Sequence, residues 1–231
     1  MSTSSHTLPR PRDPDVLGEL LHSLSQPLTG LLCSLELSLQ PPRGCSIEQV
    51  AEQQQAGVSV ALQQTERVIG MIQLMREYLD AEQPAPEAFS SALAPATRSV
   101  IEELSSISAV RGVRLRLVGT CTATVPVPES RLRLALQYLI TTLIEAQPVG
   151  GKVTLLLGEG PAGAVLRAEG ERGFQQQKPS TTSPQTTLRR ARIAIASRVL
   201  ESVGASLVFA GGDVDPAGFV LRIPRRVAAR D

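Results

Sequence analysis

The sequence of 231 residues predicts two α-helices that form a hairpin, followed by an α/β sandwich of two layers. Two observations predict this fold class. Apolar residues recur at helical spacing from about residue 15 to residue 83, and beyond the proline-rich segment 84–86 the pattern becomes a mixture of helical and alternating segments. Hydrophobic residues make up 42% of the chain, which is enough for a packed core and excludes general disorder.

The first helix is predicted to begin after Asp15, a good N-cap residue, and to carry one narrow stripe of leucines. The stripe follows the 4-3-4-3-4 spacing of a coiled-coil seam, at Leu17, Leu21, Leu24, Leu28, Leu31 and Leu35. Residues 1–14 contain three prolines and several polar residues. We expect them to form a disordered tail.

A second helix is predicted after a turn at residues 43–45, because Ser46 and Gln49 have the spacing of a capping box. Its apolar stripe consists of Val58, Ala61, Thr65, Val68, Ile72, Met75 and Leu79. Two narrow stripes cannot bury both flanks of a hairpin. We therefore expect residues 15–83 to form an antiparallel four-helix bundle in a homodimer.

The second domain is predicted to span residues 88–226 and to mix helices with strands in two layers. Pro126 marks its second strand as an edge strand. The expected elements are a helix at 93–107, strands at 113–117 and 124–127, a helix at 130–146, strands at 152–158 and 163–168, a polar loop at 175–187, a helix at 188–203, and strands at 205–210 and 218–223.

Composition excludes several classes of function. With 23 basic and 22 acidic residues the chain has no basic footprint for nucleic acid, and 3% aromatic residues give no surface for stacking bases. No apolar stretch is long enough to span a membrane, and the N-terminus has no export signal, so we expect a soluble cytoplasmic protein. Three cysteines without CxxC spacing and two histidines predict no disulfide framework and no metal site.

His22 is the residue best placed for chemistry in the first helix. It follows the stripe residue Leu21, so its imidazole is expected at the flank of the stripe, near solvent. An exposed neutral imidazole is a nucleophile at pH 7 and can carry a phosphoryl group on nitrogen. Pro27 lacks the N–H that would bond to the carbonyl of Ser23, so a bend is expected one turn after His22.

This segment resembles the H-box of the two-component sensor histidine kinases, which reads His-Glu-Leu-x-x-Pro-Leu-Thr. The matching residues are His22, Leu24, Pro27, Leu28 and Thr29. The resemblance implies that His22 is the phosphoacceptor and that receiver domains of response regulators are the partners. It also implies that receivers contact Ser25, Gln26 and Thr29, and that Gln26 can orient a water or a partner group.

The segment departs from the family at Ser23, where the family has an acidic residue that accepts a hydrogen bond from the histidine ring. A serine hydroxyl is a weaker acceptor and carries no charge. Kinase chemistry at His22 is therefore expected to be impaired.

Residues 88–224 resemble the ATP-binding domain of the same family, but its functional residues are altered. Tyr138 and Thr142 stand where the family has asparagines, the second of which binds Mg²⁺, and a threonine hydroxyl is a poorer ligand. Glu169 and Gly173 are the first and last residues of the segment matching Asp-x-Gly-x-Gly, whose first glycine is replaced by Glu171. We expect a retained fold with no cofactor, so that Mg²⁺ is supplied by the partner receiver.

The last helix is predicted to begin without the glycines that form a phosphate cradle in the family. Its first turns contain Arg189, Arg190 and Arg192 instead. We expect these three side chains to form a solvated basic face, with anion binding as the alternative.

These features favour a dimeric histidine phosphotransferase, or pseudo-histidine-kinase, that passes a phosphoryl group between receiver aspartates through His22 without autokinase activity. The first alternative is a non-catalytic dimeric scaffold, or a phosphatase-like regulator, that acts on a response regulator. The second is an ATP-dependent histidine kinase with divergent nucleotide-binding motifs.

Overall fold

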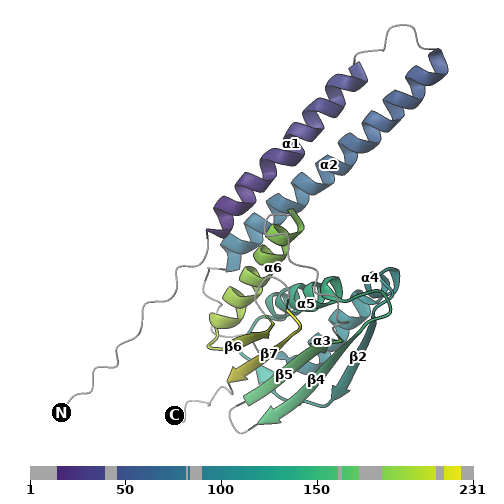
Figure 1. The fold of residues 1–231 in the computed structure, drawn as a ribbon. Coiled ribbons are helices and arrows are strands. Elements are labelled where there is room, and N and C mark those ends of the chain that lie inside the picture. The colour runs from purple at the N-terminus through teal and green to yellow at the C-terminus, as the bar shows by residue number, and fades with distance from the viewer. Residues whose placement is uncertain are drawn as a thin grey trace. The chain divides into compact units, whose positions relative to one another are not determined.

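The computed structural model describes residues 15–39, 46–81, 83, 90–160, 163–171, 184–211 and 216–224 (Figure 1). The expected tail at 1–14, the turn at 43–45, most of the proline-rich segment and Gly173 lie outside these ranges. The chain divides into two compact units, Met1–Met71 and Ile72–Asp231, so the last turns of the second helix belong to the second unit. No helix in the described ranges has the length and hydropathy needed to cross a bilayer.

Helices α1 (Val16–Leu39) and α2 (Ile47–Ala81) form the predicted hairpin. Both helix starts are capped as the sequence predicts. The backbone N–H of Gly18 donates to Oδ1 of Asp15 at 2.9 Å. Ser46 and Gln49 form a reciprocal capping box, with donor–acceptor distances of 3.1 and 3.3 Å. Side-chain oxygens thus satisfy backbone donors that have no partner within the first turn of a helix.

The face of α1 that is buried is not the predicted leucine stripe. The buried side chains of α1 are Val16, Leu20, Pro27 and Ser34. Exposed fractions of 59%, 43% and 45% remain at Leu21, Leu28 and Leu35. Part of the predicted stripe is thus not buried within the chain, and its burial in a four-helix bundle of two copies stays a prediction.

Small residues explain the difference, because they let the two helices approach closely. A Cβ atom added to Gly57 of α2 would overlap Oγ of Ser38 and would lie 3.4 Å from the carbonyl oxygen of Ser34. Ala61, one turn after Gly57, is also buried. At this close approach the helices have no room for a larger side chain, and Leu28, Leu32 and Leu35 remain exposed.

The main sheet of the second unit has five strands in the order β2-β4-β5-β7-β6. Strands β2 and β4 are parallel, and the other neighbours are antiparallel. The strand bounds are Arg114–Gly119 for β2, Lys152–Gly160 for β4, Gly163–Gly170 for β5, Ser206–Ala210 for β6 and Gly218–Pro224 for β7. All five predicted strands of this sheet are confirmed to within a few residues.

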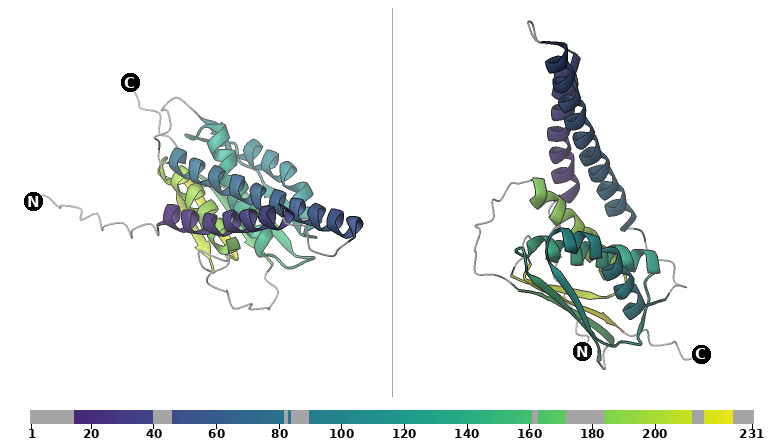
Figure 2. Two further views of the ribbon diagram at one scale, coloured as in Figure 1. Left: turned by 90° about the horizontal axis from the view of Figure 1, so that it is seen from above. Right: turned by 90° about the vertical axis from the view of Figure 1, so that its right-hand side faces the viewer.

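Helices cover one face of this sheet and leave the other face open (Figure 2). They are α3 (Leu93–Glu103), α4 (Ser105–Val110), α5 (Glu129–Ala146) and α6 (Pro184–Glu201). The core lies between the two layers, where Leu136 and Ile140 of α5 and Leu155 and Leu166 of the sheet are fully buried. The predicted two-layer sandwich is confirmed.

Three details of the second unit differ from the prediction. The helix expected at 93–107 is two helices, because the chain turns at Leu104. The edge strand expected at 124–127 is reduced to β3 (Thr124–Val125), which pairs with β1 (Ser91–Ala92) in a separate sheet. Helix α6 begins at Pro184, inside the expected polar loop. Proline fits the first turn of a helix. The early start was not predicted because this turn carries no apolar pattern.

The close approach at Gly57 yields a stability prediction. Gly57→Leu should lower the free energy of unfolding by about 1–3 kcal/mol, because a larger side chain forces the helices apart. Gly70, which has no atom within 4 Å of an added Cβ, is the matched control. Gly70→Ala should raise the free energy of unfolding by about 0.5–1 kcal/mol. Urea denaturation at one protein concentration measures both, and equal losses in the two variants would contradict this account of the seam.

Candidate functional site

The histidine face of α1 consists of His22, Ser25, Gln26 and Thr29, all of which are exposed. Their spacing of three, four and seven residues places them on one side of the helix. The hydroxyl of Thr29 donates to the carbonyl oxygen of Ser25 at 2.9 Å, so it is engaged with the backbone. Within the described part of the chain, no side-chain hydrogen bond or ion pair involves His22 or Gln26. These two polar groups are therefore available to another molecule.

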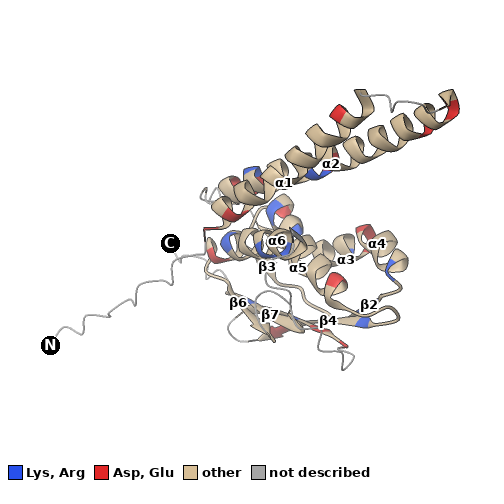
Figure 3. Ribbon diagram, turned by 45° about the horizontal axis from the view of Figure 1, so that its top comes forward, with Lys and Arg blue, Asp and Glu red and all other residues tan. Residues whose placement is uncertain are grey.

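Helix α1 carries few charges near His22. Helix α1 continues through Pro27, whose ring is buried, and its only charged residues are Glu19 and Glu36. Figure 3 shows the resulting long uncharged stretches of the hairpin in tan. Ser23 beside His22 offers no carboxylate to orient or charge the imidazole. The site thus has an exposed imidazole whose next residue is not an acid, and the nearest carboxylate on α1 is that of Glu19, three positions before His22.

In the second unit, Thr142 is sealed inside the fold. It is fully buried on α5, and its hydroxyl donates to the carbonyl oxygen of Tyr138 at 2.8 Å. A hydroxyl bonded within its own helix and closed from solvent cannot reach a hydrated cation. Among the described residues, no cluster of three or more His, Cys, Asp or Glu side chains is arranged to hold a metal ion.

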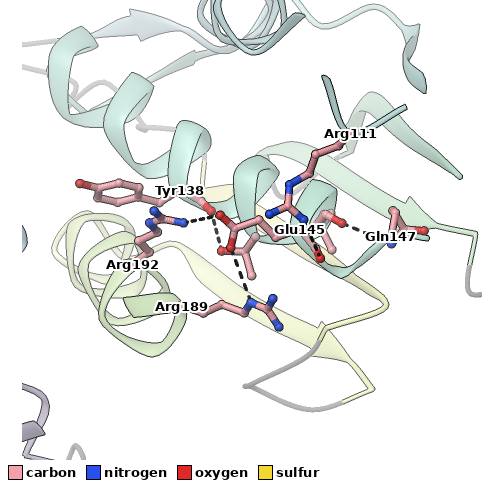
Figure 4. A network of polar contacts seen from close by, with 8 residues as sticks. Arg111, Tyr138, Glu145, Gln147, Arg189 and Arg192 are labelled. Atoms are coloured by element: carbon pink, nitrogen blue, oxygen red, sulfur yellow. Dashed lines mark hydrogen bonds and ion pairs between the residues drawn. The ribbon is translucent and has the colours of Figure 1, made fainter. Parts of the chain in front are cut away.

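The first turns of α6 are joined to α5 by an acid that the sequence reasoning missed (Figure 4). The carboxylate of Glu145 lies 2.8 Å from Nη1 of Arg192 and 3.8 Å from Nε of Arg189. All three side chains are mostly buried. The expectation of a solvated basic face is therefore wrong for Arg189 and Arg192, because a buried acid on the neighbouring helix pairs with both.

Glu145 occupies the same side of α5 as Tyr138 and Thr142, since the three residues are four and three positions apart. The arginines of α6 consequently lie against the side of α5 that carries Tyr138 and Thr142. Figure 4 shows Arg192 beside Tyr138 and Arg189 beside Glu145. An internal ion pair thus fills space near these positions.

Tyr138 connects α5 to the end of α2. Its hydroxyl donates to Oε2 of Glu77. Burial raises the pKa of the Tyr138 phenol well above its ordinary value of 10.0, and the bond to Glu77 adds to the rise. Next to Glu77, the ring of Tyr78 lies 3.9 Å below the guanidinium of Arg198 of α6 in a cation–π contact. Two adjacent residues of α2 are therefore fixed to α5 and α6.

Glu169 lies on the open face of the sheet, away from the helical layer. In β5, Ala164, Leu166 and Ala168 are buried against the helical layer, so Glu169 faces outward. There its carboxylate pairs with Arg167.

The inward position next to Glu169 is Gly170, where an added Cβ would overlap the side-chain amide of Gln147. The Nε2 of Gln147 donates to the carbonyl oxygen of Leu143 at 3.3 Å. An amide of the chain itself thus fills this corner. Glu171 is exposed, and Gly173 lies outside the described residues.

The structure is similar to that of AdeS of Acinetobacter baumannii, a histidine kinase. The two structures superpose with a TM-score of 0.63 at 14% identity, over 89% of this chain and 98% of AdeS. This chain has the histidine kinase fold. The structure of full-length ShkA in complex with AMPPNP is also similar, with a TM-score of 0.54 and 17% identity over 91% of this chain and 46% of ShkA. No protein-family model and no curated protein matches the sequence.

Within the histidine kinase fold, the sequence reasoning located Tyr138 and Thr142 but missed Glu77, Glu145 and Gln147. One signal was available for Glu145, an acidic residue in an otherwise apolar stretch of α5. Nothing in the sequence pairs it with arginines more than 40 positions away, because such pairing depends on how α5 and α6 pack.

The raised pKa of Tyr138 predicts how stability depends on pH. The folded state keeps a phenol proton that the unfolded chain loses above pH 10, so stability falls as the pH rises beyond 10. Tyr138→Phe should remove this part of the fall. Absorbance titration at alkaline pH should show a phenolate that forms late in the folded wild type and is missing from the titration of the variant. Two tyrosines that both titrate near pH 10 would contradict the burial and the bond to Glu77.

Proposed function

We propose that this protein is a histidine phosphotransferase of a two-component phosphorelay, with His22 as the phosphoacceptor. The observation that carries the proposal is the exposed imidazole of His22 on a helix that presents Ser25 and Gln26 on the same side. The histidine kinase fold of the chain is consistent with two-component signalling. The Glu145 ion pairs and the buried Thr142 argue against the alternative of a divergent ATP-dependent kinase.

The reaction needs little from this chain. A ring nitrogen of neutral His22 attacks the phosphorus of an aspartyl phosphate on the receiver. A nitrogen–phosphorus bond forms, the bond between phosphorus and the aspartate oxygen breaks, the carboxylate leaves, and the ring proton passes to solvent. The receiver supplies Mg²⁺ and the acidic pocket, while α1 holds the nucleophile on a rigid element. In the reverse direction the phosphoryl group moves from His22 to a second receiver.

We further propose that residues 15–83 form a homodimeric four-helix bundle. The exposed leucines of α1 and several apolar residues of α2 support this, because a surface of that size and apolarity needs a cover. They are Leu21, Leu28, Leu32, Leu35, Val58, Leu62, Ile69 and Ile72. A second copy of the hairpin would cover them and leave the histidine face at the flank.

Transfer from phosphorylated receivers tests the role of His22. A panel of receivers labelled with ³²P should pass label to the full-length wild-type chain in an acid-labile, base-stable form. His22→Ala should lose this label completely, because it removes the nucleophile. His6→Ala is the matched control, since it removes the other histidine of the chain, and should keep full labelling. Faster loss of receiver phosphate with no label on the chain would instead favour the phosphatase-like regulator, and binding without either effect would favour the scaffold.

Thermal unfolding with nucleotide tests the divergent kinase. Saturating MgATP should leave the unfolding midpoint of the wild type unchanged, because the Glu145 ion pairs and the Gln147 amide fill the space near the altered motifs. A nucleotide that binds the folded chain, at a free concentration of 100 times its dissociation constant, would instead raise the free energy of unfolding by about 2.7 kcal/mol. A clear rise of the unfolding midpoint that depends on both ATP and Mg²⁺ would favour the divergent ATP-dependent kinase instead.

A further inference from the structure

The open face of the main sheet concentrates positive charge along one edge. Arg114 and Arg116 of β2 and Lys152 of β4 lie on this face, because the alternate residues Val153 and Leu155 are buried against the helices. The parallel register places Arg114 opposite Lys152. Among the described residues, no carboxylate forms an ion pair with any of the three cations. Like charges that face each other across two strands destabilise a sheet.

Beside these cations, a row of mostly aliphatic side chains crosses all five strands of the open face. The registers align Val118, Leu156, Arg167, Val220 and Val208 in that order. Exposed fractions of 37% and 54% make Leu156 and Val208 accessible to a partner. At a strand spacing of about 4.8 Å, the row is roughly 19 Å long. This length matches about 13 residues of an α-helix.

The remaining charges keep the face positive. Arg222 of β7 is exposed in the next row, opposite Val165 and Ser206. Two acidic residues lie on this side of the sheet: Glu169, which pairs with Arg167, and Glu171 directly after β5, whose backbone N–H donates to the carbonyl oxygen of Lys152 at 2.9 Å. The cations still outnumber the acids, so aliphatic surface lies on a face with a net positive charge.

We propose that this open face binds an acidic amphipathic segment of another protein. Carboxylates of the segment would pair with Arg114, Arg116 and Lys152, while its apolar side lies along the row from Val118 to Val208. This binding site is separate from the histidine face and does not depend on the proposed phosphotransfer.

The chain itself offers no suitable occupant in its long segments outside the described ranges. Residues 1–14 carry two arginines and one aspartate, residues 172–183 carry two basic residues and no acid, and residues 225–231 carry three arginines and one aspartate. None of these is acidic, so charge complementarity points to a different molecule. Nucleic acid suits the face less well, because its strands place no aromatic side chain there for a base to stack on.

Binding of a synthetic probe to the full-length chain tests the proposal. The probe is a fluorescent helical peptide of about 16 residues with leucines on one side and glutamates on the other, followed by anisotropy. The double variant Arg114→Glu/Arg116→Glu should bind it about tenfold more weakly than wild type. The control Arg67→Glu/Arg98→Glu changes the net charge equally at exposed arginines of α2 and α3 and should bind like wild type. Equal losses in both variants, or no binding by wild type, would overturn the proposal.

Two further measurements separate a binding face from a charged surface without a role. Lys152→Gln should weaken peptide binding and leave the unfolding midpoint close to that of the wild type, because it removes a cation of the face that forms no ion pair among the described residues. Leu156→Ser should weaken peptide binding and leave its salt dependence unchanged. Polyglutamate without leucines should bind more weakly than the peptide. Equal binding of polyglutamate, or tighter face-dependent binding of a DNA or RNA oligonucleotide, would refute an amphipathic protein partner.

Discussion

The ion pairs of Glu145 with Arg189 and Arg192 determine how the helical layer of the second unit is assembled. A buried charge is costly unless it is paired, so each of these three groups requires the others in place. The pairs join the start of α6 to α5 on the side that carries Tyr138 and Thr142. They thereby hold arginine side chains where the sequence alone suggested a solvated surface.

The same side of α5 also binds the end of α2. Tyr138 donates to Glu77, and Arg198 covers the ring of Tyr78, so the last turns of a helix that begins in the hairpin belong structurally to the second unit. The side-chain amide of Gln147 lies against Gly170. Together with the contacts of Glu77 and Tyr78, it fills space next to Tyr138, Thr142 and Glu169.

The hairpin follows a different constraint, the close approach of its two helices at small residues. Gly57 of α2 leaves no room for a larger side chain against Ser34 and Ser38 of α1. Leu21, Leu28 and Leu35 are exposed, and the polar histidine face lies beside them on α1. One helix thus presents an apolar surface suited to a second copy and a nucleophilic surface suited to a partner, which is the arrangement that the proposed phosphotransfer requires.

The sequence by itself determined the order and type of nearly all elements, because hydrophobic periodicity and capping residues such as Asp15, Ser46 and Gln49 act locally. It also located His22 on an exposed helix flank and identified the altered positions Tyr138 and Thr142. Only the tertiary structure decided which face of α1 is buried, on which face of β5 Glu169 lies, and which acid pairs with Arg189 and Arg192. These outcomes depend on helix separation, strand register and contacts between residues far apart in the chain, and no local pattern encodes such distances.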